Sequence, residues 1–107
     1  MTSPVSLSPA QAAARLAEFT VIDVRAPGEY ASGHVPGALN IPLDRLSEAV
    51  PALKSAAARG PLLMVCASGV RSTRACDILA AADVDAATLT GGTSAWEGEG
   101  RDLDHPA

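Results

Sequence analysis

Aromatic residues are scarce in this chain of 107 residues, which contains one Phe, one Trp and one Tyr. The core must therefore come from Leu, Val, Ile and many alanines, whose small side chains favour close packing of helices on a sheet. Hydrophobic residues still make up 48% of the chain and charged residues 19%, so it can fold and is not a disordered segment. Its length predicts a single domain over residues 1–107, with a core at about 5–100.

Basic residues are also few, because eight Lys and Arg stand against twelve Asp and Glu, for a net charge of -4. This balance provides no basic surface for a phosphate backbone, so we expect no nucleic-acid partner. No apolar run reaches the roughly 18–20 residues that span a membrane. The first residues lack the basic start and the apolar run of a secretory signal. We therefore expect a cytoplasmic protein that does not bind membranes.

Cysteine and histidine are too few for a disulfide framework or a metal centre. The chain has two cysteines, Cys66 and Cys76, and two histidines. Without a secretory signal, two cysteines indicate free thiols in a reducing compartment. A metal centre would need more ligands than these residues supply. We expect neither a metal nor another cofactor.

Apolar runs alternate with helical patterns along the chain, which predicts an α/β fold with a mostly parallel sheet. Strands are predicted at residues 5–7, 21–24, 38–41, 62–65 and 86–90. Helices are predicted at residues 9–18, 29–32, 44–50, 53–58 and 72–82, with a short one around Trp96. Pro51 is expected to interrupt the helical pattern, and Ser72 is expected to cap the helix that follows it. The polar residues 98–107 are expected to form a loose tail.

Cys66 is the first candidate functional residue, because it follows the most apolar predicted strand. Ligand sites of parallel sheets lie at the carboxyl ends of strands, where loops lead into helices. Gly69 allows the following loop to adopt a positive φ, so that its amides can turn inward as an anion-binding nest. The helix terminus and Arg71 add positive charge. We therefore predict a Cys66 pKa below the ordinary value of about 8.5.

The residues of this loop do not specify which group it binds at the cysteine. A phosphoryl group, an arsenate or the outer sulfur of a persulfide would each suit an anion-binding nest on a cysteine. The alternative is that Cys66 is a packed core residue, because free cysteine is among the most buried residue types.

The segment Cys66-Ala67-Ser68-Gly69-Val70-Arg71-Ser72 resembles the active-site loop of single-domain rhodaneses, which has the pattern C-x-x-G-x-R-S. Other segments similar to that family follow in its order: Asp23-Val24-Arg25, Glu29-Tyr30, the run GHVPGALNIP from Gly33 to Pro42, and Gly91-Gly92 before Trp96. The resemblance covers about residues 5–100. It implies a three-layer rhodanese-like α/β fold, in which a mostly parallel five-stranded sheet carries helices on both faces.

The resemblance also implies an enzyme of the thiosulfate sulfurtransferase type. Cys66 matches the nucleophile that takes the outer sulfur of thiosulfate or of a persulfide donor and becomes a persulfide itself. A thiol or cyanide acceptor then removes the sulfur, and a protein can serve as the acceptor. The amides that match the cradle of the persulfide belong to Ala67, Ser68, Gly69, Val70 and Arg71.

Two other functions remain open. One is a sulfur-carrier or redox-signalling module that acts with a protein partner. The other is a phosphatase or arsenate reductase, because related enzymes of that kind have a C-x5-R loop. Here Arg71 is five positions after Cys66, which makes the pattern C-x4-R. The shorter ring fits one sulfur atom better than a four-oxygen anion, so we rank phosphatase chemistry below sulfur transfer.

Three charged residues near this loop have both a functional and a structural interpretation. The Arg71 side chain can attract an anionic donor, or it can pair with a carboxylate and brace the loop. Asp23 and Arg25 end a strand at the same rim of the sheet and could steer substrate. Buried polar groups at such positions are more often paired with one another, so we favour a structural role for this pair.

The remaining candidates are expected to have mainly structural roles. Trp96 forms either a wall of the site or part of the core. His34 belongs to the turn motif and is expected to be structural, since a thiolate in a nest needs no general base. Arg74 is interpreted as a solvated charge on a helix, and Cys76 as a buried thiol on the sheet-facing side of the same helix.

Overall fold

The computed structural model of the chain describes residues 5–106. Its strands are β1 (Val5–Leu7), β2 (Thr20–Asp23), β3 (Leu39–Asn40), β4 (Leu62–Val65) and β5 (Ala87–Leu89). Its α-helices are α1 (Pro9–Ala14), α2 (Pro27–Ala31), α3 (Leu46–Arg59), α4 (Val70–Ala80) and α5 (Gly92–Gly98). Two short 3-10 helices, η1 (Leu16–Glu18) and η2 (Leu43–Arg45), precede β2 and α3. The alternation of strands and helices predicted from the sequence is confirmed.

The strands form one parallel sheet in the order β1-β5-β4-β2-β3. At the centre, β2 and β4 pair in register, with Ile22 opposite Met64 and Asp23 opposite Val65. Because neighbouring strands run the same way, their carboxyl ends lie along one rim of the sheet. This rim receives the loops that lead into α2, α4 and α5.

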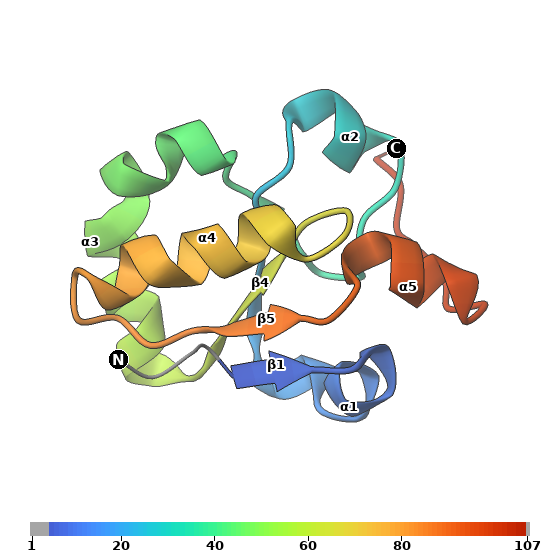
Figure 1. Ribbon diagram of the computed structural model, residues 1–107, viewed down its shortest axis with the longest axis horizontal. Coiled ribbons are helices and arrows are strands. Elements are labelled where there is room, and N and C mark those ends of the chain that lie inside the picture. The colour runs from blue at the N-terminus through green and yellow to red at the C-terminus, as the bar shows by residue number, and fades with distance from the viewer. Residues whose placement is uncertain (1–4, 107) are drawn as a thin grey trace.

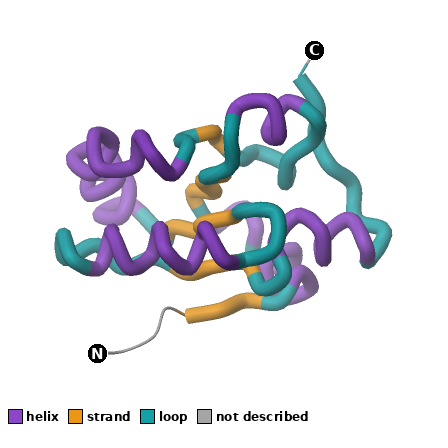
Figure 2. The backbone as a smooth tube through the Cα atoms, turned by 45° about the horizontal axis from the view of Figure 1, so that its top comes forward, coloured by secondary structure: helices purple, strands orange, loops and turns teal. Residues whose placement is uncertain are grey.

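Helices cover both faces of the sheet, as the tube in Figure 2 shows. One buried cluster joins α3 and α4 to alternate residues of the central strands, among them Ile22, Leu62 and Met64. The other cluster joins α1 and α5 to the intervening residues, among them Leu63 and Val65. Because side chains alternate along a strand, β4 supplies both layers of the core. This arrangement confirms the predicted α/β fold with helices on both faces of a five-stranded sheet.

Pro51 does not interrupt the helix, contrary to the sequence-based expectation. Helix α3 continues from Leu46 to Arg59 with Pro51 inside it. A proline lacks the N–H that would bind the carbonyl four residues earlier, here that of Ser47. Ser47 and Pro51 are both exposed, so water can bind the freed carbonyl. The buried side chains of Leu46 and Leu53 hold the two halves of the helix against the same core.

The segment after α5 is also more ordered than its polar composition predicted. Asp104 and His34 exchange two backbone hydrogen bonds, with N···O distances of 2.9 and 2.8 Å. The Trp96 indole N–H donates to the Asp102 carbonyl at 2.9 Å, and Leu103 packs against the cluster that contains Trp96. These contacts fasten residues 102–104 to the sheet rim. Within residues 5–106, no helix combines the length and apolar character needed to cross a bilayer.

Candidate active site

Cys66 stands immediately after β4, on the face of the sheet that α3 and α4 cover. Strand alternation accounts for this face, because Met64 and Cys66 are two residues apart and lie in the same cluster. The loop that follows turns into α4 at Gly69, whose φ of 104° is in the region that favours glycine. Figure 1 shows this loop between the end of β4 and the start of α4, beside the start of α5. The predicted position of Cys66 at the carboxyl end of the central strand is thus confirmed.

Hydrogen bonds surround the Cys66 sulfur. The Gly69 amide donates to Sγ at an N···S distance of 3.0 Å, and the Ser72 hydroxyl lies 3.5 Å from Sγ. The backbone amides of Ser68 and Ser72 also act on the sulfur. Those of Ser68 and Gly69 belong to the predicted cradle, whereas that of Ser72 lies one residue beyond it. The loop therefore turns several donors toward a single atom.

These hydrogen-bond donors lower the pKa of the Cys66 thiol. Burial acts to raise the pKa of Cys66, but hydrogen bonds from Ser72 and from the Gly69 and Ser68 amides outweigh burial and lower the pKa below its ordinary value. A lowered pKa means that more thiolate is present at a given pH, and the thiolate is the nucleophilic form of cysteine. The Cys66 side chain has no exposed surface. A reactant can therefore contact the sulfur only when loop residues move aside.

Ser72 has a role that the sequence analysis missed. It was expected to cap the helix, but Gly69 is the N-cap and Ser72 lies in the first turn of α4. Its buried Oγ lies 2.6 Å from Oγ1 of Thr88, on neighbouring β5. A hydroxyl that accepts from Thr88 can donate its own proton to a Cys66 thiolate. Only the pairing of β5 with β4 brings Thr88 to the site, so no local pattern could reveal this chain of hydroxyls.

The start of α5 holds the opposite side of the cysteine loop. The amides of Thr93 and Ser94 donate to the carbonyls of Cys66 and Ala67 at N···O distances of 2.9 and 3.0 Å. These bonds direct the loop carbonyls away from the sulfur and leave the amides facing it. This close contact between α5 and the cysteine loop requires glycine at position 92, because a Cβ atom there would lie 2.2 Å from the Cys66 carbonyl oxygen. The Gly91-Gly92 motif thus serves the loop through close backbone contact.

Arg71 braces the loop through an ion pair. Its guanidinium donates to both carboxylate oxygens of Glu29 on α2, at 2.7 and 2.9 Å. Glu29 also accepts from the Ala26 amide. The Arg71 hydrogen bond, followed by that of Ala26, lowers the pKa of Glu29 to about 2, so the pair is ionised at neutral pH. Of the two interpretations of Arg71, the geometry shows the bracing one, and Glu29 is the carboxylate that the sequence analysis did not identify.

Asp23 and Arg25 form a second brace at the end of β2. The Asp23 carboxylate is fully buried and accepts from both Nε and a terminal nitrogen of Arg25, at distances of 2.8–3.0 Å. Arg25 also donates to the Gly33 carbonyl at 2.7 Å. Asn40 donates to the backbone carbonyls of both residues. The pair therefore fixes the loops around β2 and β3, as the favoured structural interpretation predicted.

Comparison with known proteins identifies the family. The family model for the rhodanese-like domain matches residues 8–99. The chain belongs to the rhodanese-like family. It is 35% identical over 80 residues to the uncharacterized protein YqhL of Bacillus subtilis, which covers 74% of this chain but only 61% of YqhL. A second protein of that species, YtwF, has a provisional sulfurtransferase name and is 33% identical over 82 residues, 77% of each chain.

Solved structures agree with this assignment. A rhodanese-like domain protein from Staphylococcus aureus is 32% identical, with a TM-score of 0.81 over 96% of this chain and 99% of that one. A rhodanese-related protein from Thermoplasma volcanium has a TM-score of 0.85 at 28% identity, over 94% and 97% of the two chains. The resemblance noted in the sequence motifs is therefore confirmed.

Two other residues of the rhodanese-like motifs are structural in this chain. The Trp96 ring is buried in the cluster of α1 and α5, on the opposite face of the sheet from Cys66, so it packs in the core and does not wall the thiol. The His34 ring stacks on Tyr30 with centroids 3.8 Å apart, and its Nδ1 lies 3.0 Å from the Tyr30 carbonyl. Both observations match the structural interpretation of these residues.

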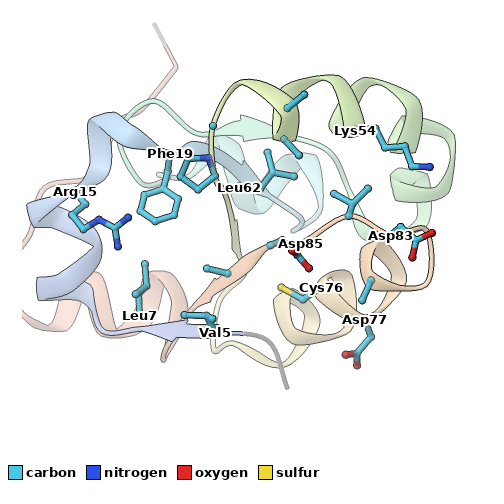
Figure 3. Close-up of a pocket in the computed structure, with 18 residues that line it drawn as sticks. Val5, Leu7, Arg15, Phe19, Lys54, Leu62, Cys76, Asp77, Asp83 and Asp85 are labelled. Atoms are coloured by element: carbon cyan, nitrogen blue, oxygen red, sulfur yellow. The ribbon is translucent and has the colours of Figure 1, made fainter. Parts of the chain in front are cut away.

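The second cysteine lies far from this loop, at the other end of the sheet. Cys76 is buried and lines an open groove of about 1000 Å³. In Figure 3 this groove lies between Phe19, Leu62 and the acidic residues Asp77 and Asp85. Burial, followed by the charge of Asp77, raises the pKa of Cys76 to about 12. Cys76 is therefore a protonated thiol at neutral pH, and its pKa is shifted in the opposite direction from that of Cys66.

Proposed function

We propose that this chain is a sulfurtransferase that moves sulfane sulfur from thiosulfate or a persulfide donor to a thiol or cyanide acceptor. The observation that carries the proposal is the Cys66 sulfur, bonded by the Gly69 amide at 3.0 Å and flanked by the Ser72 hydroxyl. Membership in the rhodanese-like family and the provisional sulfurtransferase name of YtwF support it.

The first half-reaction loads sulfur onto the protein. The Cys66 thiolate attacks the outer sulfur of thiosulfate, a new S–S bond forms, and the bond between the two donor sulfurs breaks. Sulfite leaves with that bond's electron pair, and Cys66 is left as an ionised persulfide. The charges balance, because a thiolate and a dianion give a persulfide anion and a dianion.

The cradle stabilises the charge that moves during this step. The Gly69 amide already donates to Sγ, and the amides of Ser68 and Ser72 contribute to its lowered pKa, so these donors need little reorganisation to follow charge onto the outer sulfur. The bonds from Thr93 and Ser94 keep the loop carbonyls turned away. Because Cys66 is fully buried, the loop residues must open for the donor and can then close around the persulfide.

The second half-reaction returns the enzyme to its first state. A thiolate or cyanide attacks the outer sulfur of the persulfide, and Cys66 leaves as a thiolate. The lowered pKa of Cys66, which favours attack, also makes its thiolate a better leaving group. One residue thus serves both halves of a double displacement, with no metal or general base required.

Mapping the sulfur adduct by mass spectrometry tests this proposal. The protein is treated with thiosulfate or with an alkyl persulfide, free thiols are alkylated, and the chain is cleaved with trypsin. Cys66 then lies in peptide 60–71 and Cys76 in peptide 75–101, because arginines precede and end both. We expect one extra sulfur atom on peptide 60–71 alone. An adduct on peptide 75–101 alone, or on neither peptide with either donor, would exclude the proposed function.

A further inference from the structure

Arg71, in the first turn of the helix after the cysteine loop, has its charge neutralised by Glu29. Both nitrogen contacts of Arg71 go to Glu29, and the two side chains are only about two-fifths exposed, at 38% and 39%. An anionic donor that used Arg71 would have to displace a carboxylate held by two hydrogen bonds. The arginine that the motif places beside Cys66 therefore offers little attraction to an anion.

A groove of about 650 Å³ begins at this residue and extends along α4. Its charged lining consists of Arg45, Arg71, Arg74 and Asp44. Arg45 pairs with Glu48 at 3.4 Å, just as Arg71 pairs with Glu29. With Asp44, these two carboxylates balance the three arginines, so the groove has no net formal charge. The chain as a whole carries a charge of -4, which repels dianions further.

The rest of the groove is apolar. Six hydrophobic or proline side chains line it alongside the charged residues: Val24, Ala26, Pro27, Pro42, Leu43 and Ile78. Apolar walls bind the carbon skeleton of an organic molecule and offer nothing to a small inorganic anion. The lining thus suits a donor with a carbon chain and little charge.

We propose that Glu29 determines donor specificity, because it neutralises Arg71 and makes the site select an organic persulfide of low charge over the thiosulfate dianion. This inference rests on the proposed sulfurtransferase function. The reaction is R–S–SH + Cys66–S⁻ → Cys66–S–SH + R–S⁻. The thiolate forms a bond to the outer sulfur, the donor S–S bond breaks, and the thiolate R–S⁻ leaves with its electron pair. The groove beside Arg71 holds the group R.

The substitution Glu29→Gln tests this role, because it removes the charge and keeps a side chain of the same size, and the ratio of two donors cancels any common effect on the loop that the pair braces. Glutamine keeps an oxygen that can accept from the Ala26 amide, as in a capping box, but removes the negative charge. Glu18→Gln is the matched control. Glu18 pairs with Arg15 at the other end of the sheet, so this variant has the same change in net charge at a distance from the loop.

The experiment measures the rate constant for persulfidation of Cys66 in a single turnover, from the amount of sulfur on peptide 60–71. The donors are thiosulfate, a dianion, and the persulfide of 2-mercaptoethanol, which carries at most one negative charge. Glu29→Gln should raise the ratio of the thiosulfate rate to the persulfide rate about three- to tenfold. This gain should shrink as sodium chloride is added, because salt screens the freed charge of Arg71. Glu18→Gln should leave the ratio at its wild-type value.

Failure of this inference is distinct from failure of the proposed function. If both donors load Cys66 but Glu29→Gln leaves the ratio unchanged, or the gain is insensitive to salt, the role of Glu29 is wrong and sulfur transfer stands. If neither donor loads Cys66 in the wild-type chain, the proposed function falls, and the specificity argument falls with it.

Discussion

Replacing Cys66 with serine should reduce thiocyanate formation from thiosulfate and cyanide by about a thousandfold or more, to the uncatalysed rate. A serine hydroxyl stays protonated at neutral pH and forms no persulfide, so both half-reactions lose their nucleophile. Serine is close to cysteine in size, and its oxygen can bond to the Gly69 amide and the Ser72 hydroxyl that now contact Sγ. The folded state should therefore persist, as thermal unfolding would show.

Cys76→Ser provides the matched control for this substitution. It removes the chain's other thiol, which is buried away from the loop and whose pKa is raised to about 12. We expect this variant to retain turnover. Turnover that survives in Cys66→Ser and disappears in Cys76→Ser would reverse the assignment of the two cysteines.

Replacing Gly92 with alanine should damage both stability and activity. The new Cβ would lie 2.2 Å from the Cys66 carbonyl oxygen and 2.6 Å from backbone atoms of Ala67, so the cysteine loop or α5 must shift. The residue also has a φ of 60°, which disfavours alanine. Strain and overpacking together should cost about 2 kcal/mol or more in the free energy of unfolding. A loop displaced by about 1 Å should transfer sulfur roughly a hundredfold more slowly.

Urea unfolding and the persulfidation rate measure these two effects, with Gly98→Ala as the control. Gly98 ends the same helix, and no atom lies within 4 Å of the Cβ position there. The control should match the wild type in both measurements. A Gly92→Ala variant with the wild-type rate would show that the contact between α5 and the loop does not shape the cradle.

Local patterns in the sequence were enough to predict much of this site. The apolar run of β4, the glycine at position 69 and the helix after it were sufficient to place Cys66 at the rim and to predict a lowered pKa. These features depend on neighbouring residues, which a sequence displays directly. The motif resemblance then supplied the family and the remaining segments of the fold.

Contacts between segments that are distant in the sequence could not be predicted from local patterns. Glu29 reaches Arg71 across 42 positions, and Thr88 reaches Ser72 across 16, so neither partner follows from local spacing. The order of the segment after α5 also depends on a contact between distant residues, because Asp104 pairs with His34. The sequence alone offered two interpretations of Arg71, and only the position of α2 beside α4 distinguishes them.

A direct titration of the Cys66 thiolate tests the central claim, that the amide cradle and Ser72 lower the pKa of this sulfur. The ultraviolet absorbance of the thiolate is followed against pH in the Cys76→Ser variant, where Cys66 is the only thiol. A lowered pKa means that thiolate persists as the pH falls, so the midpoint should lie below about 8.5. Adding Ser72→Ala removes a hydrogen bond that lowers the pKa and should move the midpoint upward. A midpoint at or above 8.5 in the parent, or one that Ser72→Ala leaves in place, would contradict this account of the site.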